Sequence, residues 1–144
     1  MLTQEIEQLL DHEAVINDQP HTHAAWSVGD VAHQGDLIFI GLPSMPTGAK
    51  VRKNRQLADG TTQGSRHILV GGKCYDADAS KVVAAIRAAT KRVVVDKYIG
   101  PVFRGPCQVT HPEHGDHVWS DDCVVAVVYQ RNLDSEQREQ MAVD

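Results

Sequence analysis

Short apolar runs bounded by turn residues limit what this chain can fold into more than any other feature of its sequence. The clearest run is Leu37–Leu42, which follows Gly35 and Asp36 and ends before Pro43. Its length and its branched and aromatic side chains favour a buried strand over a helix. Residues 123–130 have the same character without polar alternation, so we expect a central strand that is buried on both faces.

The same pattern recurs along much of the chain. The further strands that it predicts cover residues 66–70, 92–96, 100–109 and 117–119. Residues 50–54 are basic and polar, and we expect a loop or an edge strand there. These segments together predict a domain that is mostly β.

Two segments have helical periodicity instead. Residues 80–91 place four apolar side chains on one face, and Asp78 or Ser80 can cap the first turn. The four side chains are Val82, Val83, Ile86 and Ala89. A shorter amphipathic helix is expected over residues 3–11. The fold class that follows is α+β and mostly β: a small antiparallel barrel or sandwich with an N-terminal helix and one packed helix.

Length and composition indicate one domain. The chain has 144 residues, of which 42% are hydrophobic and 23% charged, as is ordinary for a globular protein. We expect an N-terminal helix and linker over residues 1–24, a β-rich core over residues 25–132 and a charged tail over residues 133–144. Residues 21–23 then lie in the linker, where Pro20 favours a loop.

The net charge and the lack of targeting signals restrict the classes of partner and the cellular compartment that we expect for this protein. The formal net charge of −5 argues against a nucleic-acid partner, because the protein's field repels a polyanion. The one cluster of basic residues, 50–55, is expected to be a solvated loop. The opening residues lack a basic and apolar leader, and the longest apolar run has six residues, so no membrane segment is expected. Three cysteines without a CxxC pair predict a reduced, cytoplasmic protein.

The densest polar cluster is residues 111–117, which set three imidazoles and two carboxylates within seven residues. Pro112 excludes a helix interior and Gly115 permits a positive φ, so we expect a tight turn between two strands. Imidazole and carboxylate groups suit Zn²⁺, Fe²⁺ or Mn²⁺. The turn is therefore a candidate site for a divalent metal ion.

His67 can complete such a site if its strand neighbours this turn. We take His67, His111 and His114 as candidate metal ligands, with His117 as a fourth. Three protein ligands leave one position for water, whose pKa the metal lowers, and Glu113 is the nearest general base. The function predicted on this basis is metal-dependent hydrolysis of an unidentified small molecule.

Other interpretations of the same residues stay open. A polar hairpin tip with exposed histidines is equally typical of a non-enzymatic interaction or assembly protein, which would bind a protein partner or form a homo-oligomer. The glycines of residues 60–67 could hold an anion with backbone amides and Arg66. Cys107 lies four residues before His111, which allows a Cys/His pair, whereas burial would make Cys123 inert.

Several motifs occur in an order that resembles a small family of bacterial and phage-associated proteins. The motifs are Gln34-Gly35-Asp36, Gly64-Ser65-Arg66-His67, Ile99-Gly100-Pro101-Val102, His111-Pro112-Glu113-His114 and Tyr129-Gln130-Arg131. The resemblance covers most of residues 34–131. It implies a compact β-rich domain and a phage or mobile-element context, and it carries no substrate with it. By position, His67, His111, Glu113 and His114 match the family's polar motifs.

Overall fold

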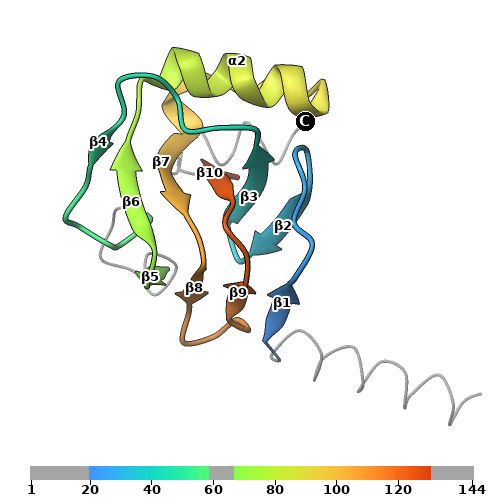
Figure 1. The fold of residues 1–144 in the computed structure, drawn as a ribbon, viewed down its shortest axis with the longest axis vertical. Helices are drawn as coiled ribbons and strands as arrows, with labels where there is room; N and C mark the ends of the chain where they lie inside the picture. The colour runs from blue at the N-terminus through green and yellow to red at the C-terminus, as the bar shows by residue number, and fades with distance from the viewer. Residues whose placement is uncertain (1–19, 59–66, 131–144) are drawn as a thin grey trace, which may run out of the picture.

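The computed structural model describes residues 20–58 and 67–130, and in this part of the chain strands dominate (Figure 1). The large sheet has the order β2 (Val31–Gln34), β3 (Leu37–Leu42), β10 (Val124–Tyr129), β7 (Ile99–Arg104), β6 (Lys73–Asp76), β4 (Lys50–Val51). The small sheet has the order β1 (His21–His23), β9 (His117–Trp119), β8 (Cys107–Thr110), β5 (Ile68–Val70). The predicted α+β sandwich is confirmed. Its pairs are antiparallel except for β1, which runs parallel to β9.

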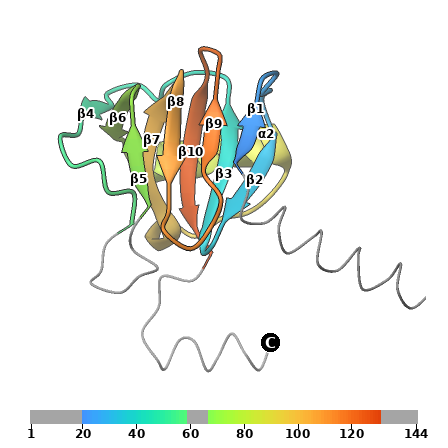
Figure 2. The same ribbon diagram turned by 90° about the horizontal axis from the view of Figure 1, so that it is seen from below.

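The core lies in two layers, one on each face of the large sheet. Figure 1 shows helix α2 (Ala79–Thr90) above the large sheet and the small sheet below it, and Figure 2 shows the same sandwich turned by 90°. Between the sheets pack large side chains such as Phe39, Phe103 and Trp119. Between the large sheet and α2 pack Ile40, Val102 and other aliphatic side chains.

Strand β10 is central, as predicted. It pairs with β3 on one side and β7 on the other. Val125 and Val127 point to the layer between the sheets, whereas Val124, Ala126 and Val128 point toward α2. All five are buried, so the unbroken apolar run reflects burial on both faces.

Helix α2 also matches its prediction closely. Asp78 is the N-cap, and its carboxylate accepts a hydrogen bond from the amide of Ser80. Val82 and Ile86 are fully buried against the sheet. The helix ends at Lys91, whose left-handed conformation (φ 66°) lets its amide bond the carbonyl of Arg87.

Two segments that were predicted to be single strands have a different structure from the one predicted. Residues 92–96 form no strand: this segment pairs with no strand of either sheet, and Val93 and Val95 are exposed. A short 3₁₀-helix, η2 (Asp96–Tyr98), follows instead. Residues 100–109 form two strands, because the chain turns at Gly105 and Pro106 from β7 in the large sheet to β8 in the small sheet.

Three strands were not expected from the sequence. β2 and β6 are short and half-polar, and β1 lies in the segment expected to be a linker loop. β1 is held by its register with β9 and by the bond from the amide of His21 to the carbonyl of Asp116, 2.7 Å. The helix expected over residues 3–11, the tail 133–144 and the glycine loop ahead of His67 lie outside the described residues. No helix of the described part is long and apolar enough to span a membrane.

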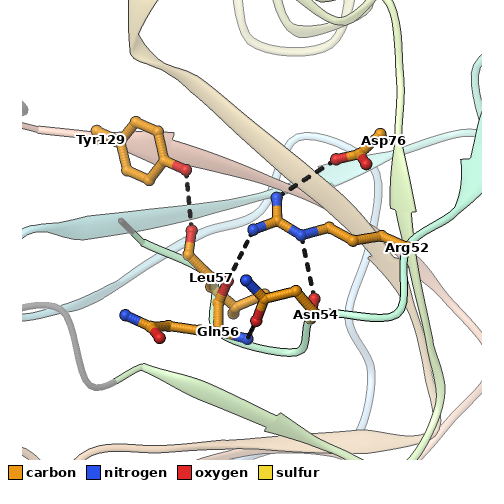
Figure 3. Close-up of polar contacts among 6 residues, drawn as sticks. All are labelled: Arg52, Asn54, Gln56, Leu57, Asp76 and Tyr129. Atoms are coloured by element: carbon orange, nitrogen blue, oxygen red, sulfur yellow. Dashed lines mark hydrogen bonds and ion pairs between the residues drawn. The ribbon is translucent and has the colours of Figure 1, made fainter. Parts of the chain in front are cut away.

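Two arginines of the basic segment around β4 donate hydrogen bonds within the protein, and Figure 3 shows the contacts of Arg52. Arg52 donates hydrogen bonds to the carbonyls of Asn54 and Gln56 and pairs with the carboxylate of Asp76 at 3.3 Å. Arg55 donates to the carbonyls of Gly71 and Gly72. Two of the basic side chains therefore stabilise the loop and the edge strand that the sequence predicted here.

We expect Arg52→Ala to lower the free energy of unfolding by about 1–3 kcal/mol, because it leaves two carbonyls without their charged donor. The neighbouring Lys53 is exposed, and Lys53→Ala should change stability by less than about 0.5 kcal/mol. Urea unfolding followed by circular dichroism compares the two. Equal midpoints for both variants would show that the Arg52 contacts add no net stability.

Candidate functional site

Six histidines from distant parts of the chain form two adjoining groups between the sheets and at the β8–β9 turn. We call His67, His111 and His114 the His67 group, and His21, His23 and His117 the His117 group. Gln34, at the end of β2, contacts the His67 group through Nδ1 of His67. The predicted neighbourhood of His67 and the β8–β9 turn is thus present, because β5 pairs with β8.

The β8–β9 turn is built around the ring of His111. Its Nδ1 accepts hydrogen bonds from the amides of Glu113 at 3.0 Å and His114 at 3.2 Å. In a neutral imidazole only one nitrogen carries the proton, so these bonds place the proton of His111 on Nε2. His111 is 6% exposed, and its ring holds the turn together from the buried side through these two bonds.

His67 has the opposite tautomer. The side-chain amide of Gln34 donates to the carbonyls of Val109 and Gly115, both at 3.0 Å, which fixes its oxygen as an acceptor. That oxygen lies 2.8 Å from Nδ1 of His67, so Nδ1 donates and Nε2 bears the lone pair. A buried imidazole held in one tautomer by an outer hydrogen bond is the arrangement usual for metal-ligating histidines.

The three rings of the His67 group form a chain of contacts, with His111 in the middle. Ring centroids are 4.4 Å apart between His67 and His111, and 4.5 Å apart between His111 and His114. Gly35 makes room for them, because it has a φ of +58° and a Cβ there would lie 2.9 Å from the ring of His114. The turn that precedes β3 therefore helps to assemble this group.

A polar cavity of about 380 Å³ lies against the outer side of the His67 group. His111, Glu113, His114 and Asp116 line it together with Pro20, Pro112 and Gly115. Glu113 and His114 are exposed, whereas His67 is fully buried behind them. The predicted base Glu113 thus borders a cavity into which a small polar molecule can enter.

His117 is not with the other predicted ligands. It is 3% exposed, and its ring stacks on that of His21 with a centroid distance of 4.6 Å. Its Nδ1 lies 2.9 Å from Nε2 of His23. That His117 is a fourth ligand beside His67 stays a prediction. In this structure the His117 ring contacts those of His21, its register partner on β1, and of His23.

The environment of His117 and His23 disfavours their protonated forms. Burial, together with His21 and His23, lowers the pKa of His117 to about 3, and a hydrogen bond with the backbone of His33 only partly opposes this shift. Burial and His21 lower the pKa of His23, against the effect of Asp30. Phe39, Trp26 and Trp119 pack around these rings.

Among residues 20–58 and 67–130, no set of three His, Cys, Asp or Glu side chains converges closely enough to hold a metal ion without movement. The thiols are poor nucleophiles, because burial raises the pKa of Cys123 and raises that of Cys107 to about 12. The expected inertness of Cys123 agrees with this. The chemistry of the site therefore rests on imidazole and carboxylate groups.

Sequence reasoning missed Gln34, His21 and His23 as members of the site. The signal for the last two was present, since residues two apart in a strand face the same side. The motifs behind the family resemblance also meet here: the turn after Gln34, His67 and the β8–β9 turn are in contact. Comparison with protein-family models, curated proteins and solved structures gave no match to this chain.

Proposed function

We propose that this protein binds a divalent transition-metal ion, zinc, iron or manganese, at the His67 group and uses it for hydrolysis. The observation that carries the proposal is the fixed tautomer of His67, whose lone pair on Nε2 faces away from Gln34 beside two further imidazoles. Neutral imidazoles with an oriented outer hydrogen bond are the usual ligands of such ions.

Metal binding requires the β8–β9 turn to adjust. In the described conformation the lone pair of His111 on Nδ1 accepts bonds from the amides of Glu113 and His114. To act as a ligand, His111 exchanges these bonds for the metal. His114 is exposed at the rim and can turn toward the ion without disturbing the core.

The ion would supply a water of lowered pKa, and Glu113 would take its proton. Glu113 suits this role because it is exposed, borders the cavity and precedes His114 in the turn. The cavity of about 380 Å³ limits the substrate, or the part of it that reacts, to a small polar group.

The test is metal titration of EDTA-treated protein, followed by assays with chromogenic esters and phosphoesters. Wild type should bind metal and show metal-dependent turnover. His114→Ala should lose this ion while keeping the fold, because the ring is exposed. Glu113→Gln should keep the ion and lose about 10²–10⁴-fold in rate, whereas Asp121→Asn, an exposed carboxylate outside the cavity, should change neither. Equal metal content in wild type and His114→Ala would refute the proposed site.

A non-enzymatic interaction protein is the second candidate. It is favoured by apolar side chains on the outer face of the small sheet, where Ile68 is 37% and Val70 51% exposed on the β5 strand. Exposed apolar residues grouped on one face are typical of protein-binding surfaces. The titration separates the two functions, because this surface has no need of an ion.

A further inference from the structure

The strand register brings three imidazoles together at the edge of the small sheet. His21 and His23 are two residues apart on β1 and therefore face the same side. His21 is the register partner of His117 on the neighbouring strand β9. We propose that the His117 group is a second, independent binding site for a divalent transition-metal ion of the zinc and copper class.

Two of the donor atoms are already close to the required separation. Nε2 of His23 and Nδ1 of His117 are 2.9 Å apart, with a proton between them. Two nitrogens that each lie about 2.0–2.1 Å from a tetrahedral zinc ion are about 3.3 Å apart. The nitrogens must move apart by a few tenths of an ångström and both rings must turn so that their lone pairs converge on the ion. The bridging proton moves through solvent to the other ring nitrogen of His23.

The surroundings prepare both rings for a metal. The His117 ring also has a hydrogen bond with the backbone of His33, and an outer contact of this kind is usual for a ligating histidine. Burial disfavours the protonated form of both His23 and His117.

Access and the third ligand come from the edge of the sandwich. An open cavity of about 260 Å³, lined by His23, Trp26, Asp30 and two further residues, gives access to His23. The carboxylate of Asp30 lies on this path and attracts a cation. His21 is half-buried at the sheet edge, so its ring can turn from its stacked position toward the ion.

Fluorescence tests this site separately from the His67 group. The chain has two tryptophans. Their ring centroids lie 4.8 Å (Trp26) and 5.0 Å (Trp119) from that of His23. We therefore expect Cu²⁺ added to EDTA-treated protein, after removal of the chelator, to quench tryptophan fluorescence saturably, and Zn²⁺ to reverse the quenching by competition. His23→Gln should weaken the Cu²⁺ response at least about tenfold.

The controls separate this site from surface binding and from the proposed hydrolytic site. Asp121→Asn, at an exposed carboxylate, should leave the quenching unchanged. His114→Ala should also leave it unchanged, even though it removes the ion of the His67 group. If His23→Gln fails to fold by circular dichroism, His21→Gln replaces it. Quenching of full strength in a folded His23 or His21 variant, or none in wild type, would overturn the inference.

Discussion

Val125→Asp is expected to unfold the protein or to make it insoluble. Val125 is fully buried on β10, between β3 and β7, and its side chain faces the core between the sheets. Burying a carboxylate there without a partner costs several kcal/mol, which is comparable to a typical domain stability of about 5–15 kcal/mol. Soluble yield and a thermal melt by circular dichroism measure the effect.

Val93→Asp makes the same chemical change at a position that is 76% exposed. Its stability should lie within about 0.5 kcal/mol of wild type. A Val125→Asp protein that is soluble and melts cooperatively close to Val93→Asp would show that β10 is not the central strand of the core.

Acid is expected to destabilise the metal-free protein through His117. Its pKa is about 3 in the folded state, because burial and the neighbouring His21 and His23 disfavour the charged ring. In the unfolded chain the pKa returns to about 6.5. Between these values the unfolded state binds more protons, so stability rises with pH. The stabilisation is complete above about pH 6.5 and is lost as the pH falls toward 3.

The expected loss between pH 7 and pH 4 is about 3 kcal/mol, from a slope of up to about 1.4 kcal/mol per pH unit. Urea unfolding at several pH values in the presence of EDTA measures it. His117→Gln should flatten this dependence, whereas His114→Gln, at an exposed position in the β8–β9 turn, should keep it. Identical pH dependence in wild type and His117→Gln would rule out His117 as the cause.

Local sequence patterns predicted those elements in which the apolar side chains coincide with the buried faces. The runs that became β3 and β10 are apolar on both faces, and α2 has an apolar stripe and a capping aspartate. Strands β1, β2 and β6 carry no such signal, because each has exposed or half-buried positions and owes its conformation to a neighbouring strand. Residues 92–96 show the converse, since their apolar pattern predicts a strand although the segment pairs with no strand and Val93 and Val95 are exposed.

The sequence by itself determined that the fold is a β-rich barrel or sandwich with a packed helix, and that His67 and the turn of residues 111–117 are candidates for chemistry. Only the tertiary structure decided how the histidines are divided, because that depends on which strands pair. The pairing of β5 with β8 places His67 beside His111. The parallel pairing of β1 with β9 places His117 beside His21 and His23. Strand pairing is a contact between distant segments, so no local pattern of histidines could specify it.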